Sequence, residues 1–145
     1  MLSIKQTIDR LCRRYDTRDP FAIAQQLGII LLYEPLGSIR GYYGKSSRQK
    51  FIHINQNLCR EQRRIVCAHE LGHAVLHADA NTPFLRANTF FSVNKLEQEA
   101  NRFMVQLLVT DEQLRDCMDC GYTVPQLARS IGVPDGLIRY RISNL

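Results

Sequence analysis

Two histidines four residues apart, and the glutamate that follows the first of them, are the residues best suited to chemistry in this sequence. They form His69-Glu70-Leu71-Gly72-His73, an H-E-x-x-H motif. Residues four apart on an α-helix lie on one face, so both imidazoles could bind a single metal ion. Glu70 would then act on a water molecule in the open coordination position of that ion. The alternative is a buried helix in which both histidines are hydrogen-bonded core residues.

The residues around the motif are typical of a long helix. No proline interrupts residues 58–78, and apolar residues recur there at roughly helical spacing. These apolar residues are Leu58, Ile65, Val66, Ala68, Val75 and Leu76. Because a short motif with free positions often matches by chance, this helical context is what favours a metal site.

A catalytic zinc ion needs a third protein ligand and a position that stays open to water. His77 lies eight residues after His69, which is about 12 Å along a helix axis at about 1.5 Å per residue. We therefore expect His77 to pack near the site or to contact a ligand rather than to bind the ion. Asp79 stands where H-E-x-x-H-x-x-G-x-x-H enzymes carry their last ligand, but Leu76 replaces the glycine at which their chain turns.

Two glutamates of the next strongly periodic segment, Glu97 and Glu99, are the remaining candidates for the third ligand. That segment predicts a helix over residues 95–109, on which Glu97 shares a face with Asn101. A carboxylate ligand with an amide four residues later could bind the ion and also steady a ligating histidine. The spacing favours Glu97, with Asn101 in the supporting role, and leaves Glu99 open.

The N-terminal third of the chain predicts helices followed by a small sheet. Helices are expected over residues 3–15, with Ser3 as cap, and from Asp19-Pro20 to Gly28. Strands are expected over residues 29–33, 39–43 and 51–54. An exposed strand edge beside the metal helix could hold an extended peptide by main-chain hydrogen bonds.

The second half of the chain predicts helices almost throughout. Residues 79–94 show no clear period and are expected to form a loop near the site, with Asn94 as the cap of the helix that follows. Further helices are expected over residues 111–118, over 124–131 and, after a turn at Gly132, from Pro134 onward.

Composition indicates a single globular domain over residues 1–145. Apolar residues make up 45% of the chain and charged residues 23%, which is normal for a soluble protein. No secretory leader is visible, and no apolar run approaches the ~20 residues of a membrane span, so a cytoplasmic protein is expected. The net charge of +5 permits an acidic or nucleic-acid partner without requiring one.

The five cysteines form no even disulfide framework, which favours reduced thiols. Cys117 and Cys120 are spaced as half of a zinc site or as a redox pair. The sequence offers no second such pair and no nearby histidine. We therefore expect ordinary surface or helix-end cysteines.

Residues 123–145 have the shape of a helix-turn-helix (HTH) within that domain. With the basic balance of the chain, this tail could belong to a DNA-binding regulator whose zinc is structural. However, the second helix begins with Asp135, offers only Arg139 and Arg141 as cations, and carries no obvious set of base-reading side chains. Packing against the core or docking of a protein partner is the favoured role.

Together the motifs resemble the ImmA/IrrE family of zinc metallopeptidases over most of the chain. The H-E-x-x-H motif is shared by many zincins, whereas its combination with E-x-E-A-N-x-F at this distance is much more specific. The likeness is carried by Asp19-Pro20-Phe21, Gly41-Tyr42, Phe51-Ile52-His53-Ile54-Asn55, Ala68-His69-Glu70-Leu71-Gly72-His73 and Glu97-Gln98-Glu99-Ala100-Asn101-Arg102-Phe103. One departure is Val109-Thr110, where the family has a proline, and this should affect only how the helix ends.

The resemblance implies an α+β fold: a zincin-like, gluzincin-type metallopeptidase core, a small N-terminal sheet packed on helices, and an HTH-like helical tail. It further implies that His69, His73 and a glutamate of the second motif bind Zn2+, and that Glu70 is the catalytic base. The E-x-x-x-N/D spacing of thermolysin-like zincins favours Glu97 as that glutamate.

The expected reaction is hydrolysis of a peptide bond in one protein partner. Members of the family that resemble this small form cleave the HTH repressor of a prophage or integrative element and so relieve repression. Direct DNA binding is not expected. The residue that stabilises the oxyanion stays open among Tyr42, Tyr43, Arg86 and Tyr140.

Overall fold

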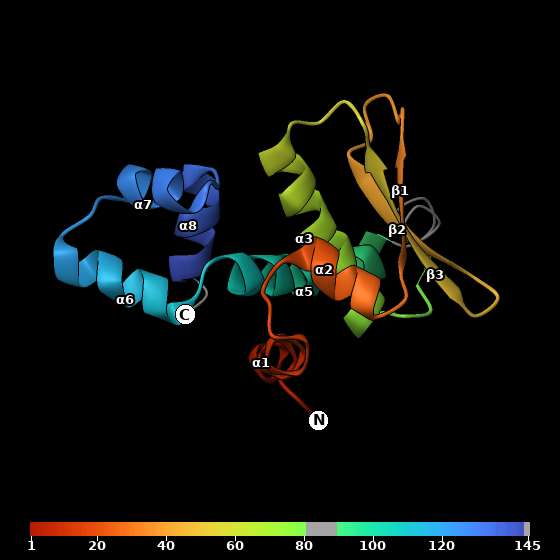
Figure 1. The fold of residues 1–145 in the computed structure, drawn as a ribbon, viewed down its shortest axis with the longest axis horizontal. Coiled ribbons are helices and arrows are strands. Elements are labelled where there is room, and N and C mark those ends of the chain that lie inside the picture. Colours follow the sequence, from red (N-terminus) through yellow and green to blue (C-terminus); the bar gives the residue numbers. More distant parts are fainter. Residues whose placement is uncertain (81–89, 144–145) are drawn as a thin grey trace.

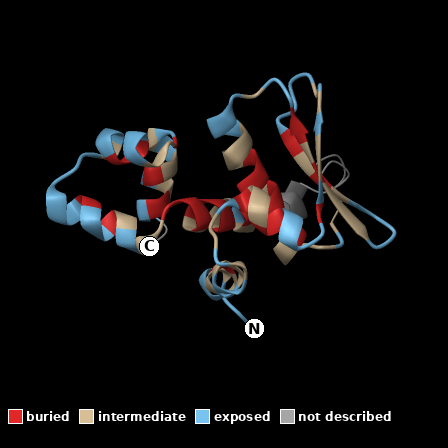
Figure 2. Cartoon of the chain, viewed as in Figure 1, coloured by how far each residue is buried: buried red, intermediate tan, exposed pale blue. Residues whose placement is uncertain are grey.

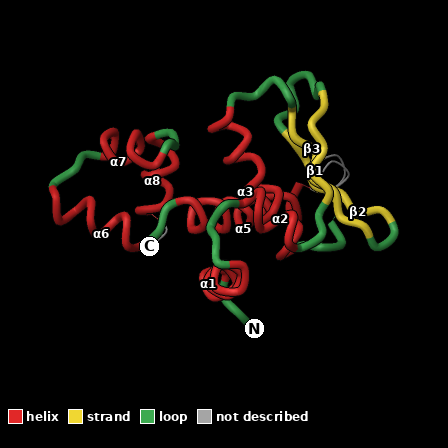
Figure 3. Tube along the Cα trace, in the orientation of Figure 1, coloured by secondary structure: helices red, strands yellow, loops and turns green. Residues whose placement is uncertain are grey.

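The chain forms three strands and seven helices within the residues that the structure, a computed structural model, describes: 1–80 and 90–143 (Figure 1). The helices are α1 (Ile4–Tyr15), α2 (Pro20–Gln26), α3 (Arg60–Leu76), α5 (Phe90–Leu108), α6 (Asp111–Cys120), α7 (Val124–Ile131) and α8 (Asp135–Ser143). The strands are β1 (Ile30–Glu34), β2 (Gly41–Ser46) and β3 (Gln49–Asn55). The fold is therefore α+β, as predicted, with the strands gathered at one side (Figure 3).

The first two helices begin at the predicted caps. The hydroxyl of Ser3 accepts a hydrogen bond from the Gln6 N–H at 3.1 Å, and the Gln6 side chain accepts one from the Ser3 N–H at 2.9 Å. Asp19 caps α2, and Pro20 occupies its first turn. Gly28 follows that helix with φ of +76°, a conformation that favours glycine and turns the chain into β1.

The sheet has the strand order β1-β3-β2, with β1 parallel and β2 antiparallel to β3. Side chains alternate between its faces: Tyr43, Ile52 and Ile54 are fully buried toward the helices. Tyr42 and His53 lie on the opposite face, where their rings stack with centroids 4.2 Å apart. Strand β2 is at the edge of the described sheet, and that this edge is open to a peptide stays a prediction.

Both hairpin strands differ in extent from the prediction of residues 39–43 and 51–54. Strand β2 begins only at Gly41 and continues to Ser46, and β3 begins at Gln49. The two strands are joined by a tight turn at residues 47–48, where Ser47 has φ of +56°. Residues 44–46 and 49–50, which extend the two strands beyond their predicted ends, have no apolar side chains. They pair through the main chain, so hydrophobic alternation does not reveal them.

The loop predicted over residues 79–94 is wrong at its C-terminal end, because α5 begins at Phe90. Asn94 therefore lies inside this helix and does not cap it. Asparagine is favoured at N-caps, but its cost inside a helix is small, and no proline or glycine between Phe90 and Asn94 interrupts the helix. The middle of the predicted loop, including Arg86, lies outside the described residues.

Helix α3 is the centre of the molecule and packs on α5, on α2 and on the sheet. The buried residues gather along α3 and α5 where these helices meet (Figure 2). At that contact a Cβ atom added to Gly72 would come within 3.1 Å of the Phe103 Cβ. The glycine inside the H-E-x-x-H motif thus allows α5 to approach α3 closely.

Helices α6, α7 and α8 lie beyond one end of α5 (Figure 1). Thr110 and Thr123 cap α6 and α7, and Gly121 and Gly132 end them with positive φ. The buried Arg141 of α8 donates to the Val109 carbonyl at 3.0 Å and is paired with Asp111. These contacts attach α8 to the junction of α5 and α6.

No described helix combines the length and the apolar character needed to cross a lipid bilayer.

Candidate metal centre

The structure brings His69, His73 and Glu97 together at the contact of α3 with α5. The Nε2 atom of His69 lies 2.9 Å from one carboxylate oxygen of Glu97, and the Nε2 atom of His73 lies 3.1 Å from the other. One potential ligand atom from each residue falls within 4.8 Å of the other two. Two imidazoles and a carboxylate are a donor set typical of catalytic zinc sites.

The local sequence explains why these groups converge. His69 and His73 are one helical turn apart on α3, and their rings meet edge to face with centroids 5.0 Å apart. Glu97 reaches them from α5, which the absence of a side chain at Gly72 allows to lie close by. The site therefore depends on the packing of two helices whose residues are more than 20 positions apart in the chain.

Burial also favours the form of His73 that can bind a metal. The side chain of His73 is only 1% exposed, and this burial lowers the pKa of His73 below its ordinary value. The hydrogen bond to Glu97 and the negative charge of that carboxylate both raise the pKa of His73, but burial has the larger effect. A neutral imidazole has the free nitrogen lone pair that a metal ion requires.

His77 and Glu99 lie behind His73 rather than at the centre. The Nδ1 atoms of His73 and His77 are 3.0 Å apart, and the Nε2 atom of His77 is 3.5 Å from a carboxylate oxygen of Glu99. A bond between the Nδ1 atoms holds the His73 ring with its Nε2 atom toward Glu97. The structure thus separates the two glutamates of the second motif: Glu97 faces the paired histidines, and Glu99 faces His77.

Asp79 lies away from this group. Its side chain is 94% exposed and pairs with Lys45 at 3.0 Å. The hydrogen bond and charge of Lys45 lower the pKa of the Asp79 carboxyl. Asp79 occupies the sequence position of the last ligand in H-E-x-x-H-x-x-G-x-x-H enzymes, but its side chain pairs with Lys45 and not with His69 or His73.

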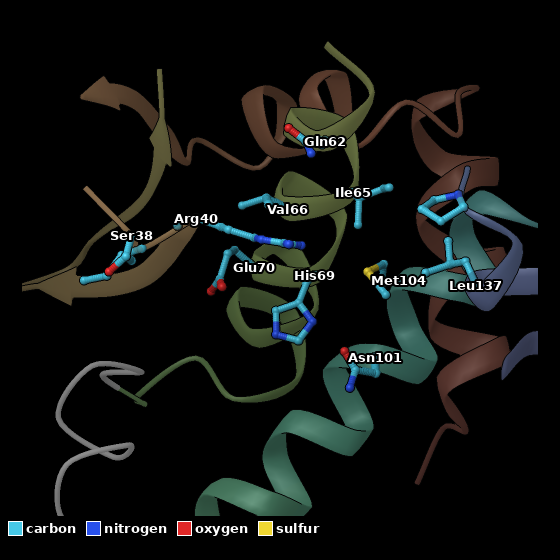
Figure 4. A pocket seen from close by; sticks show the side chains of 13 residues that line it. Ser38, Arg40, Gln62, Ile65, Val66, His69, Glu70, Asn101, Met104 and Leu137 are labelled. Carbon is cyan, nitrogen blue, oxygen red and sulfur yellow. The ribbon is translucent and has the colours of Figure 1, made fainter. Parts of the chain in front are cut away.

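Glu70, the predicted base, is 2% exposed and lines a cavity of about 670 Å³ beside the group of His69, His73 and Glu97. His69 and Asn101 line the same cavity, and Figure 4 shows all three side chains directed toward it. The carboxylate of Glu70 and the imidazole of His69 therefore border the same cavity, as a base and a metal ligand acting on one substrate would require. That Asn101 steadies a ligating histidine remains a prediction.

The predicted oxyanion-stabilising residues are placed in different surroundings. Tyr43 is fully buried and its hydroxyl donates to the Ala78 carbonyl. Burial, together with the charge of Asp79, raises the pKa of Tyr43 to about 12. Tyr42 stacks on His53, and Tyr140 is not among the residues that line the cavity.

Sequence reasoning missed Arg40, which lines the cavity and extends toward His69 in Figure 4. It stands just before β2 and inside the strand predicted over residues 39–43, where a single arginine forms no motif, so no pattern singled it out. The next residue shows why it lies there: a Cβ atom on Gly41 would come within 2.6 Å of both the His53 carbonyl oxygen and the Val66 side chain. Only a glycine lets this strand approach α3 so closely.

The two cysteines of the C-x-x-C spacing are both free thiols. Cys120 is exposed at the end of α6, as expected, whereas Cys117 is buried and its thiol contacts the Tyr122 carbonyl at 3.6 Å. Cys117 is therefore a core residue of the C-terminal helices rather than a surface one.

Comparison with known proteins identifies the family of this chain. Residues 24–143 match the sequence model of the peptidase M78 family, described as the IrrE N-terminal-like domain. The chain belongs to the ImmA/IrrE family. The match extends from α2 to the end of α8, and so includes both helices that carry His69, His73 and Glu97.

Two relatives illustrate the similarity. The metallopeptidase ImmA of Bacillus subtilis strain 168 is 32% identical over an alignment that covers 98% of this chain and 85% of the relative. The immunity region protein 2 of Bacillus phage phi105 is 41% identical over 132 residues, which are 90% of this chain and 84% of the relative. Family membership implies a metallopeptidase with a bound metal ion, and the His-His-Glu group is where the described residues could hold one.

Proposed function

We propose that this protein is a zinc-dependent endopeptidase with a zincin-like core. The observation that carries the proposal is the convergence of His69, His73 and Glu97 beside a cavity that Glu70 also lines. The donor set fits zinc, because borderline-soft Zn2+ favours imidazole nitrogen combined with one carboxylate. Glu97 is the proposed third ligand, and Asn101 the group that steadies a ligating histidine.

The roles of the protein groups follow from their positions. A bound ion supplies Lewis acidity, which makes water a better nucleophile and polarises the carbonyl of the scissile bond. Glu70 accepts a proton from the attacking water and returns it to the leaving amine. The edge strand β2 begins in the cavity wall at Gly41 and can hold the substrate as an added antiparallel strand.

We further propose that the natural substrate is the HTH repressor of a prophage or integrative element, which cleavage would inactivate. Support comes from the relative whose name places it in the immunity region of a phage. Such an enzyme acts on one partner, so cleavage should be sought with the repressor of the element that carries it. The protein would then act in the cytoplasm, where that repressor is.

Metal content tests the site directly. Mass spectrometry of the purified wild type should find close to one zinc ion per chain, and the His69→Ala and Glu97→Ala variants should lose it. Glu99→Ala is the matched control, because Glu99 lies two residues away on α5 and faces His77. Loss of zinc from Glu99→Ala with retention in Glu97→Ala would overturn the assignment of the third ligand.

Replacing the proposed base tests the reaction. Glu70→Gln keeps the size of the side chain and should retain zinc and the melting temperature while losing cleavage by about 10²-fold or more. The measurement is cleavage of the repressor followed by gel electrophoresis and mass spectrometry. Cleavage by Glu70→Gln at the wild-type rate would show that another group takes the proton.

A DNA- or repressor-binding regulator with structural zinc is the alternative, suggested by the α7–turn–α8 arrangement. One observation weighs against DNA contact: Arg141 is buried against Val109 and Asp111. Among the described residues of α8, this leaves Arg139 as the exposed basic residue. The two functions differ in their dependence on conditions. DNA binding should weaken steeply with salt, whereas cleavage should stop when a chelator removes the metal.

A further inference from the structure

The cavity beside Glu70 is lined by both polar and apolar side chains. The polar ones include His69, Glu70, Asn101 and Arg40. An apolar part of the lining, formed by Ile65, Met104 and Leu137, lies on the side of His69 away from Glu70 in Figure 4. These three side chains come from α3, α5 and α8 respectively.

We propose that this apolar part receives an aliphatic side chain of the substrate next to the scissile bond, and that Leu137 of α8 sets this preference. The inference rests on the proposed function and adds to it a substrate class. It also gives the C-terminal helices a role in the active site rather than in DNA contact.

Proximity is the first reason. Glu70 and His69 line the same cavity as Leu137, so a carbonyl group held at the metal centre has this volume beside it. Neighbouring side chains of an extended peptide project on alternate sides, about 3.4 Å apart along the chain. A residue adjacent to the scissile bond can therefore reach the wall formed by Ile65, Met104 and Leu137.

Size and chemistry are the second reason. About 670 Å³ is within the range of pockets that enclose small ligands and is sufficient for a leucine or methionine side chain with its backbone. Burial of an aliphatic side chain against three aliphatic walls removes apolar surface from water. A lysine or aspartate side chain packed against Ile65, Met104 and Leu137 would lose hydration beside side chains that offer it no hydrogen bond.

The fixed position of α8 is the third reason. Leu137 and Arg141 are four residues apart and so lie on the same face of the helix. Arg141 is anchored by the Val109 carbonyl and by Asp111, and Ile138 beside Leu137 is fully buried. Leu137 itself is half-buried, as expected of a wall residue that keeps one side open to a ligand.

Hydroxamates test the proposal without any need for cleavage, because they bind zinc directly. The probes are acetohydroxamate and peptide hydroxamates of two designs, which place glycine, leucine or lysine on either side of the chelating group. Their affinities for the zinc-loaded full chain would be measured by isothermal titration calorimetry. In one design the leucine compound should bind about tenfold or more tightly than its glycine counterpart, and the lysine compound should show no such gain.

Variants assign the gain to the wall. Leu137→Asn should reduce the leucine-to-glycine affinity ratio several-fold while leaving acetohydroxamate binding unchanged. Ile142→Ala is the matched control, because Ile142 is an exposed apolar residue of the same helix that does not line the cavity. Ile65→Thr changes the wall from α3 and keeps the test valid if Leu137→Asn does not fold.

The possible failures are distinguishable. If acetohydroxamate binds but leucine gives no gain in either design, the pocket is wrong and the metal centre stands. An unchanged ratio in folded Leu137→Asn and Ile65→Thr would likewise overturn the pocket. If zinc-loaded protein does not bind acetohydroxamate, or zinc does not load, the proposed function fails and the pocket fails with it.

Discussion

At the scale of single residues, the candidate metal centre consists of ligand candidates and groups that hold them. Glu97 contacts the Nε2 atoms of His69 and His73, and the Nδ1 atom of His77 contacts the Nδ1 atom of His73. A ring that must present Nε2 to an ion needs a partner at Nδ1, since that bond fixes both its tautomer and its orientation. His77 is thus a positioning residue for His73.

Removal of His77 should weaken metal binding without removing a ligand. We expect His77→Ala to bind zinc about 10- to 100-fold more weakly than the wild type in competition with a chelating indicator. Asp79→Ala, a change two residues later in an exposed carboxylate, should leave zinc affinity unchanged. Equal affinities of His77→Ala and the wild type would mean that the helix alone orients His73.

At the scale of elements, two glycines set how closely the neighbours of α3 approach it. Gly72 lies against Phe103 of α5, and Gly41 of β2 lies against Val66 and the His53 main chain. Each contact places a chemically important neighbour, Glu97 in one case and Arg40 in the other. The site is therefore built by helix and strand packing as well as by its polar residues.

Substitution of Gly41 tests this packing. Gly41→Ala should lower the free energy of unfolding by about 1–3 kcal/mol in chemical denaturation, because the added methyl group meets main-chain atoms that cannot move aside easily. Gly44→Ala is the control in the same strand, since a Cβ atom there meets nothing within 4 Å. Its effect should stay below about 1 kcal/mol. If both variants unfold at the same denaturant concentration, the close approach of β2 to α3 does not constrain residue 41.

At the scale of the whole molecule, Asp111 connects three distant parts of the chain. Its carboxylate pairs with Lys5 of α1 at 2.7 Å and with Arg141 of α8. Hydrogen bonds from Lys5 and Arg141 lower the pKa of Asp111 below its ordinary value. The N-terminal helix, α6 and α8 thus meet at one acidic group.

This connection predicts acid sensitivity. Because the folded-state pKa is lowered, the contribution of Asp111 to stability is complete above the unfolded-state pKa of about 3.9 and is lost as pH falls through the folded value. Asp111→Asn should therefore be less stable than the wild type near neutral pH, by about 1 kcal/mol because the carboxylate is partly exposed. The difference should shrink below about pH 4 in thermal melts.

Asp116→Asn, on the exposed side of the same helix, is the control for removing a negative charge from α6. It should leave stability nearly unchanged at every pH. If Asp111→Asn stays less stable than the wild type by the same amount down to about pH 2, the carboxylate charge does not hold these helices together.

The sequence by itself determined the helices and the reactive residues on them. Apolar periodicity specified α3, and four-residue spacing put His69 and His73 on one face of it, because both depend only on local helical geometry. Caps at Ser3 and Asp19 likewise act over three or four residues. The family resemblance, which comparison bore out, depended on these same local motifs.

Tertiary structure decided what depends on the approach of distant segments. Glu97 rather than Glu99 faces the histidines because of how α5 is rotated against α3, and spacing within α5 only favoured this outcome. The burial of Arg141, the place of Arg40 and the cavity wall at Leu137 gave no local signal at all. Each depends on contacts between residues far apart in the chain, and periodicity records only which face of an element is buried, not what covers it.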